Sequence, residues 1–117
     1  MGARTTWAIK TEQGDAVTWL YSHWGGDSKF EDTQRALAKA EPRWHDSTYG
    51  ARIFISQIIG DQWDSETGFG ITTGTLDNVP FEESYELVVV DFTNNTISYG
   101  SNSLTFSEFV EYSRVGA

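Results

Sequence analysis

The sequence predicts an α+β fold, a two-layer sandwich in which three helices pack on a mostly antiparallel sheet of four or five strands, in the order ββααβββα. Three observations predict it: two alternating segments on either side of Gly14, two segments with helical periodicity within residues 29–59, and an apolar run at residues 87–90. At 117 residues the chain has the length of one domain, so we expect a single domain over residues 1–117.

The first predicted element is a β-hairpin of residues 4–12 and 16–24, joined by a short glycine turn, Gln13-Gly14-Asp15. Successive strand residues point to opposite faces. One face of the second strand then carries Val17, Trp19, Tyr21 and His23, and the other carries Thr18, Leu20, Ser22 and Trp24. Because both faces carry rings, we expect this strand to be central in the sheet or to be covered on one side by something other than the main core.

Two helices are predicted next. Gly25-Gly26-Asp27 ends the strand, and Ser28 with Glu31 forms a capping box for a first helix that stops before Pro42. Asp46 or Ser47 is the N-cap of a second helix over residues 48–59, and Gly60 stands at its C-terminal cap. The isoleucines of this segment also allow a strand there.

The remaining strands lie in the second half of the chain. Residues 69–73 form a short edge strand inside the loop-rich segment 61–80. Residues 86–92 form a strand buried on both faces, and Asn94-Asn95 turns it into a strand over residues 96–100. A last helix over residues 106–114 begins at a capping box of Thr105 and Glu108.

Charge is distributed unevenly along the chain. Its net charge is −9, yet residues 1–52 hold seven acidic and seven basic side chains, while residues 53–113 hold ten acidic ones and no lysine or arginine. An acidic surface repels a nucleic-acid backbone and attracts a basic protein patch, so we expect no binding to long nucleic acid. No run of about 18 apolar residues is present, so we expect no membrane span. The absence of cysteine fits the cytoplasm.

The first candidate binding cluster lies where the second strand meets the first helix, and it consists of Tyr21, His23, Trp24, Gly25 and Gly26. Its rings could stack on a flat ligand, at roughly 1–3 kcal/mol per ring. Amides at a helix N-terminus favour a phosphate or carboxylate. The alternative is an ordinary strand end whose aromatic residues belong to the core.

The second candidate cluster, Arg43, Trp44, His45, Tyr49 and Arg52, lies around the start of the second helix. An arginine among rings can bind an anion or the plane of a base. The alternative is that Arg52 pairs with Asp46 or Glu41 and that Trp44 anchors the core.

Enzyme motifs are missing. Two histidines are too few for a convincing zinc site, no serine stands in a nucleophile elbow, and Gly25-Gly26 is followed by neither a P-loop nor a dinucleotide fingerprint. We therefore expect no catalytic residue, no metal and no cofactor.

Several segments together resemble small acidic proteins of unassigned role that bacteriophages and mobile elements encode. The resemblance is carried by Tyr21-Ser22-His23-Trp24-Gly25-Gly26, by Trp44, by Tyr49-Gly50-Ala51-Arg52-Ile53, and by Leu87-Val88-Val89-Val90-Asp91. It implies a protein of the host-cell cytoplasm with a counter-defence role. Some phage proteins of this size sequester a nucleotide signal, and others are acidic inhibitors of a defence enzyme.

The sequence thus predicts a non-enzymatic binding protein that sequesters a small, anionic, nucleotide-derived ligand. Trp24 would stack on the base together with Tyr21 or Trp44, and His23 would hydrogen-bond an edge. Arg52 and Arg43 would pair with phosphate, and the amides of Gly25 and Gly26 would assist them. This prediction requires the two clusters to line one hollow, within one chain or at a subunit interface of a homo-oligomer. The rival prediction is an acidic protein–protein inhibitor that mimics nucleic acid and docks on a basic host protein through acids such as Glu82, Glu83 and Glu86.

Overall fold

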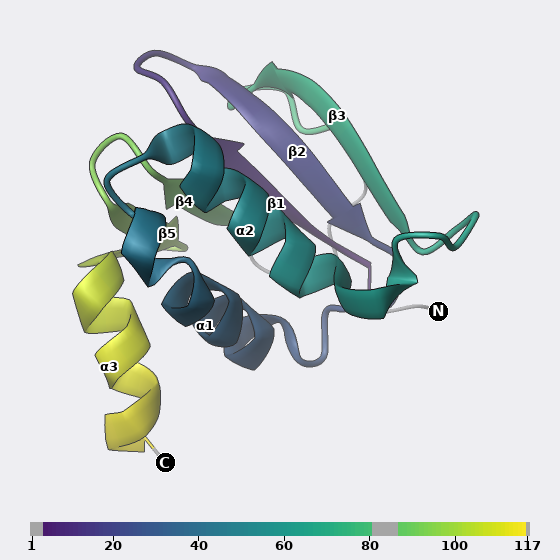
Figure 1. The fold of residues 1–117 in the computed structure, drawn as a ribbon. Coiled ribbons are helices and arrows are strands. Elements are labelled where there is room, and N and C mark those ends of the chain that lie inside the picture. The colour runs from purple at the N-terminus through teal and green to yellow at the C-terminus, as the bar shows by residue number, and fades with distance from the viewer. Residues whose placement is uncertain (1–3, 81–86, 117) are drawn as a thin grey trace.

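The computed structural model describes the backbone of residues 4–80 and 87–116, and their side chains as far as Glu111. The chain is α+β, as predicted (Figure 1). Two short 3-10 turns, η1 (Glu41–Arg43) and η2 (Gly60–Gln62), follow the first two helices. The main elements in chain order are β1 (Thr5–Lys10), β2 (Ala16–Ser22), α1 (Lys29–Lys39), α2 (Ser47–Ile59), β3 (Phe69–Thr75), β4 (Val88–Asp91), β5 (Thr96–Tyr99), β6 (Asn102–Thr105) and α3 (Phe106–Gly116).

The strands form one mixed sheet, and here the prediction is wrong in number and order. Within the described residues the sheet has six strands in the order β3-β2-β1-β4-β5-β6. Four neighbouring pairs are antiparallel, but β1 and β4 are parallel and join the two predicted hairpins. The prediction missed β6, so the observed order is ββααββββα.

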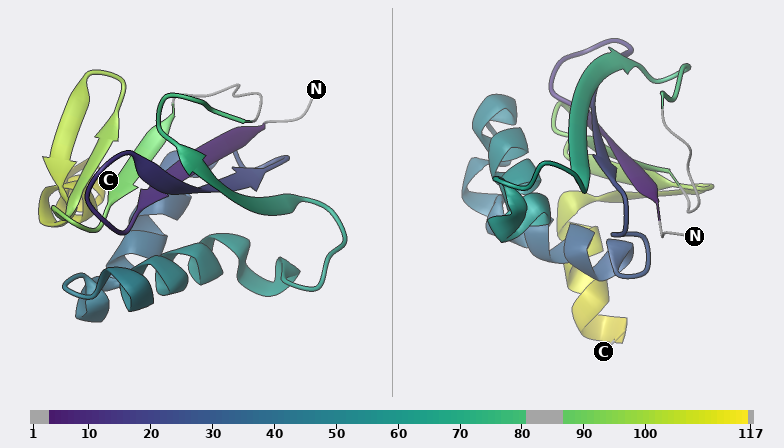
Figure 2. Two further views of the ribbon diagram at one scale, coloured as in Figure 1. Left: turned by 90° about the horizontal axis from the view of Figure 1, so that it is seen from above. Right: turned by 90° about the vertical axis from the view of Figure 1, so that its right-hand side faces the viewer.

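The helices pack on one face of this sheet. Figure 2 shows α1 and α2 along the same side of the strands. The main core on that side contains Trp7, Leu20, Leu37, Phe54 and Phe106, each at most 1% exposed. Burying such side chains contributes about 1.5–3 kcal/mol each, so this interface holds the helices to the sheet.

The opposite face has a smaller core around Trp19, which is 0% exposed. Trp19 packs with the buried Ala8 and Val17, and the half-buried Leu87 and Val89 of the valine-rich segment lie against them. The expected cover on one face of β2 by something other than the main core is therefore confirmed, because Leu20 lies in the main core and Trp19 in this second core. The strand lies between β1 and the edge strand β3.

The helix ends show which cap predictions were correct. Asp46 caps α2, accepting a hydrogen bond from the backbone N of Tyr49 at 3.2 Å, and Gly60 ends the helix with φ of 64°. At α3 the backbone N of Thr105 donates to Glu108 Oε1 at 2.9 Å, and the backbone N of Glu108 donates to Thr105 Oγ1 at 3.1 Å. Both predictions are confirmed.

The capping box predicted for α1 is wrong. Ser28 is the N-cap residue, but its side chain makes no capping hydrogen bond. Ser28 Oγ instead donates to Asp32 Oδ2 at 2.8 Å, since the backbone at Ser28 (φ −110°, ψ 19°) lies outside the extended region that a capping side chain requires.

The remaining boundaries differ by a few residues. The predicted edge strand at residues 69–73 is present and extends to Thr75. The segment predicted as a strand over residues 86–92 is β4 from Val88 to Asp91, and Glu86 lies outside the described residues. Among residues 4–80 and 87–116, no helix has the length and apolar composition needed to cross a bilayer.

Candidate functional site

The structure brings together the three rings predicted at the end of β2. Tyr21 Oη and His23 Nδ1 are 2.9 Å apart and hydrogen-bonded, and the rings of His23 and Trp24 meet edge to face with centroids 5.4 Å apart. The backbone N of His23 donates to the carbonyl of Gly68 at 2.8 Å, which joins this strand end to the residue before β3. The rings are thus held by contacts on both sides.

Gly68 is the support for the Trp24 indole. Its φ of +103° suits glycine, and a Cβ at this position would lie 2.8 Å from Trp24 Cζ2. The indole therefore packs directly on the glycine backbone. Trp24 nevertheless stays 53% exposed, so part of the ring remains open to a ligand.

These rings border a hollow of about 430 Å³, which we call the Trp24 hollow. It is lined by Tyr21, His23, Trp24, Thr67 and Gly68. Ring faces and hydrogen-bonding groups line it, and no arginine or lysine is among the described residues that do so. The Trp24 hollow can therefore stack a flat ligand, while its own lining supplies no fixed positive charge for a phosphate.

The two glycines predicted beside these rings have different surroundings. The backbone of Gly25 packs on Ser22, because a Cβ there would lie 2.6 Å from Ser22 Oγ. The carbonyl of Gly26 accepts a hydrogen bond from the backbone N of Lys29 at 3.2 Å. Gly26 also borders a second hollow, which the sequence did not predict.

This second hollow, the Phe30 hollow, has a volume of about 240 Å³ and lies between the start of α1, strands β4 and β5, and α3. It is lined by Gly26, Asp27, Lys29, Phe30, Thr33, Val88, Tyr99 and Phe109. Phe30 packs edge to face against Tyr99 and Phe109, with ring centroids 5.4 and 5.0 Å apart. Three aromatic side chains from three separate elements thus form its wall.

A buried hydrogen-bonded layer lies beside the Phe30 hollow. Lys29 is 5% exposed, and its Nζ donates to the carbonyl of Thr6 at 2.9 Å and lies 5.3 Å from the Trp7 ring centroid. Thr33 Oγ1 accepts from Trp7 Nε1 at 2.8 Å and donates to the carbonyl of Lys29 at 2.6 Å. The ammonium group of Lys29 therefore lies next to apolar rings, where a positive charge is weakly screened.

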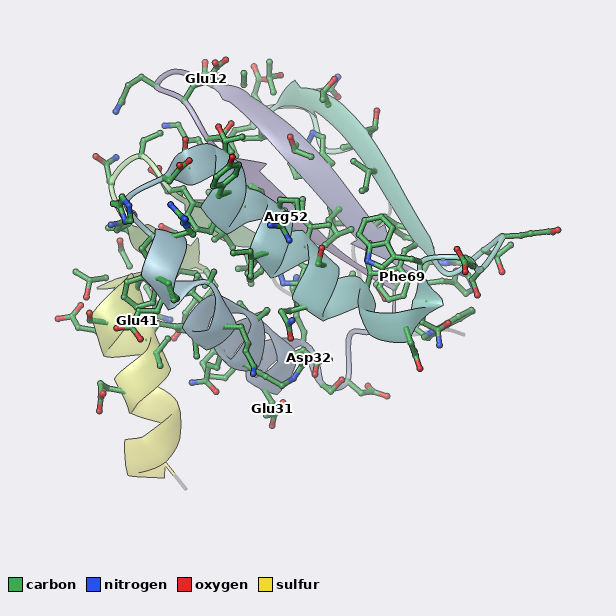
Figure 3. The ribbon with its side chains drawn as sticks, viewed as in Figure 1. Glu12, Glu31, Asp32, Glu41, Arg52 and Phe69 are labelled. Atoms are coloured by element: carbon green, nitrogen blue, oxygen red, sulfur yellow. The ribbon has the colours of Figure 1, made fainter. Side chains whose placement is uncertain are left out.

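The second predicted cluster is divided between the surface and the core. The Arg43 guanidinium lies 5.2 Å from the centre of the Tyr49 ring, and both side chains are exposed. Trp44 Nε1 instead donates to the carbonyl of Leu37 at 2.9 Å, and its ring packs on Phe106 with centroids 5.2 Å apart. Trp44 is therefore a core anchor, while Arg52 is exposed on the outer side of α2 (Figure 3).

The two predicted clusters lie towards opposite ends of the sheet. Trp24 follows Ser22, which pairs with Thr5 at the start of β1. Gly50, in the first turn of α2, lies against Phe92, whose backbone N donates to the carbonyl of Lys10 at the end of β1. Since β1 has six residues, roughly 17 Å of strand separates these two levels. No residue of the second cluster lines the Trp24 hollow.

The described residues show no candidate metal centre, because residues 4–80 and 87–116 contain no group of three or more His, Asp or Glu side chains placed to hold an ion. Asp91, the acid with the clearest polar contacts, is used in a turn. Its Oδ1 accepts hydrogen bonds from the backbone N and the hydroxyl of Thr93 at 2.8 and 2.6 Å.

Comparisons of the chain with protein-family models, with curated proteins and with solved structures give no match.

Proposed function

We propose that this chain is a non-enzymatic binding protein for a small planar ligand that carries an anionic group. The observation that supports the proposal is the placement of two hollows on either side of one segment, residues 21–27. Tyr21, His23 and Trp24 line one hollow, and Gly26 and Asp27 line the other. A nucleotide-derived signal, sequestered as part of a counter-defence role, is the narrower form of this proposal.

The Phe30 hollow is the better place for the ligand's ring. Its volume of about 240 Å³ exceeds the ~150 Å³ that holds benzene in an engineered cavity. It is smaller than the ~300–1,000 Å³ of pockets for drug-sized ligands. A single ring or one nucleobase therefore fits its size, and the rest of a larger nucleotide would extend outside.

The anionic group would lie near Gly26 and the beginning of α1. The N-terminus of a helix favours negative charge through its backbone N–H groups and its dipole. Lys29 adds a positive charge at the same point of the chain, where Asp27 also borders the hollow. In this proposal neither Arg43, in the turn before α2, nor Arg52, on α2, contacts the ligand.

Ligand-induced melting shifts test this proposal. The intact protein is titrated with adenosine monophosphate, cyclic mononucleotides, cyclic dinucleotides, ADP-ribose derivatives and benzoate. We expect a shift of several degrees with at least one single-ring or mononucleotide ligand, because a ligand present at 100 times its Kd stabilises by about 2.7 kcal/mol. No shift with any compound at millimolar concentration would refute the proposal.

Two matched tyrosine variants locate the site. Tyr99→Leu removes a ring from the wall of the Phe30 hollow and keeps an apolar side chain there. Tyr49→Leu removes an exposed ring from the first turn of α2. Because an aromatic pair contributes about 0.5–1.5 kcal/mol beyond area burial, Tyr99→Leu should weaken binding roughly 2- to 12-fold. Tyr49→Leu should leave it unchanged, and equal effects would contradict the assignment.

A second candidate function is binding to a basic protein, the acidic-inhibitor role of the rival prediction. It is supported by the charge of residues 53–80, which contain no lysine or arginine and whose acids Asp61, Asp64, Glu66 and Asp77 are all exposed. Glu82, Glu83 and Glu86 lie outside the described residues. Binding of this kind should weaken steeply with salt, and Trp24→Ala should leave it intact. An affinity for a basic partner that is independent of salt would contradict it.

A further inference from the structure

We infer that the outer edge of β3 binds an extended, basic segment of a partner protein, which adds to the sheet as a further strand. This inference rests on the second candidate function, binding to a basic protein, and it names the surface and the form of the partner. It is independent of the Phe30 hollow.

The first support is the state of the β3 edge. Across seven consecutive positions β3 pairs with β2 without a bulge, and among the described residues it pairs with no other strand. Its outer backbone groups therefore face away from the sheet along about 23 Å. Natural edge strands are usually protected by charge, proline, a bulge or short length. The sequence Phe69-Gly-Ile-Thr-Thr-Gly-Thr75 has no charged residue and no proline.

The opposite edge of the sheet shows the usual protection by comparison. Strand β6 has four residues and leads directly into α3, whose first residue is Phe106. The long, uncharged edge is thus confined to β3. Strand addition to such an edge takes its affinity from main-chain hydrogen bonds.

The second support is the charge at both ends of β3. Asp64 and Glu66 precede the strand and Asp77 follows it, and all three are exposed. The exposed Asp15 lies at the same end as Asp77, because its carbonyl accepts a hydrogen bond from the backbone N of Leu76 at 3.1 Å. Acids at both ends favour a basic occupant. A second copy of this chain, with its own net charge of −9, would bring the same acids into contact.

Two hollows at the ends of β3 provide places for the partner's side chains. A hollow of about 190 Å³ at its start is lined in part by Ile59, Trp63, Phe69 and Ile71. Trp63 and Ile71 are 54% and 49% exposed, so apolar surface is open there. A hollow of about 430 Å³ at the other end is lined in part by Glu12 and Thr75.

Figure 3 shows Phe69 at the start of β3 and Glu12 at the tip of the connection between β1 and β2, towards the other end of the sheet. The first hollow suits an apolar side chain, and the second suits a lysine or arginine. The bound segment is therefore extended, with an apolar residue at one end and a basic residue at the other.

A peptide pair tests the backbone part of the inference. The probe is a synthetic nine-residue peptide of alternating lysine and valine with a leucine at one end. Its control has the same sequence with every second backbone nitrogen methylated, which removes the hydrogen-bond donors of one edge and keeps the charge. With the intact protein at low salt, we expect the unmodified peptide to bind at least tenfold more tightly and to slow amide exchange at alternate residues of 69–75.

Two glutamate variants test the location. Glu12→Lys and Glu41→Lys change the net charge equally, but Glu12 lines the hollow at the end of β3, whereas Glu41 lies in η1 beside α1 (Figure 3). We expect Glu12→Lys to weaken peptide binding about three- to fivefold and Glu41→Lys to leave it within a factor of 1.5.

The outcomes separate the inference from the function on which it rests. Equal affinity of both peptides, equal effects of both variants, or slowed exchange outside β3 would overturn strand addition, while salt-sensitive binding would still support a basic partner. Absence of binding by either peptide would also overturn strand addition. Binding to immobilised polylysine at low salt, measured separately, would then decide whether the acidic surface binds basic partners at all.

Discussion

Replacing Gly50 with alanine should destabilise this protein, although the same change in an open helix is stabilising. Gly50 lies in the first turn of α2 and is buried. A Cβ at this position would lie 2.6 Å from the carbonyl oxygen of Arg43 and 2.8 Å from Cε1 of Phe92. Real Cβ atoms essentially never make contacts this short, so the chain has to move to accept one.

Neither neighbour of Gly50 can move easily. The Arg43 carbonyl accepts a hydrogen bond from the backbone N of Asp46 at 3.0 Å, and Asp46 is the N-cap of α2. Phe92 is 4% exposed, and its ring packs on Phe106 with centroids 5.0 Å apart. Moving either one disturbs the start of the helix or the main core.

The size of the effect follows from two opposing terms. Alanine is favoured over glycine in a helix interior by about 1 kcal/mol, while overpacking a core costs about 1–3 kcal/mol. Because this contact includes a fixed backbone oxygen, we take the upper part of that range. Gly50→Ala should therefore lower the free energy of unfolding by about 1–2 kcal/mol, which is roughly 4–8 °C in Tm for a domain of this size.

Urea denaturation measures this difference, with Thr48→Ala as the matched control. Thr48 is exposed in the same turn of α2, so its replacement should change stability by less than about 0.5 kcal/mol. A Gly50→Ala protein more stable than the wild type would show that the close approach of Arg43, Gly50 and Phe92 does not hold in solution.

Two further predictions concern polar contacts. Burial raises the pKa of Asp91, but hydrogen bonds from Thr93 and Asn94 outweigh it and hold the pKa below the usual 3.8. The stabilisation is thus present above pH 4 and lost as pH falls through the lower, folded-state pKa. Asp91→Asn should cost about 1–2 kcal/mol at pH 7 and progressively less below pH 4, and a pH-independent cost in urea titrations would contradict this. Thr105→Ala should cost about 1 kcal/mol and Ser28→Ala less than about 0.5 kcal/mol, and equal losses on urea denaturation would contradict the cap assignment.

The contrast between Ser28 and Thr105 shows how far local sequence determines structure. Both residues begin the pattern in which a hydroxyl residue precedes glutamate by three positions. Thr105 forms the capping box and Ser28 does not. Thr105 ends a strand and already has extended backbone, whereas Ser28 follows the Gly25-Gly26-Asp27 turn, which sets a different backbone angle. The pattern located both helices, but the preceding turn decided the hydrogen bonds.

The strand topology shows the limit of local patterns. The hairpins of β1 with β2 and β4 with β5 follow from short turns, and both were predicted correctly. The parallel pairing of β1 with β4 joins segments that β2, two helices and β3 separate in the chain, so no turn residue encodes it. The valine run indicated burial on both faces but not the neighbouring strand. β6 was missed because Asn102-Ser103-Leu104-Thr105 carries a single apolar residue.

The tryptophans explain why only part of the candidate site could be predicted. Composition and spacing place five of them in the chain, but whether a ring is open to a ligand depends on contacts with distant residues. Trp7 Nε1 donates a hydrogen bond to Thr33 Oγ1, and Trp44 Nε1 donates one to the carbonyl of Leu37. Trp19 is fully buried.

Trp24 and Trp63 remain more than half exposed. Trp24 packs on Gly68. Trp63 shares a hollow with Phe69, which directly follows Gly68 in the chain. The two open indoles therefore flank the start of β3 from different hollows. A ligand or partner that quenches the fluorescence of one of these tryptophans and not of the other would show whether it binds on the Trp24 side of this region or at the β3 edge.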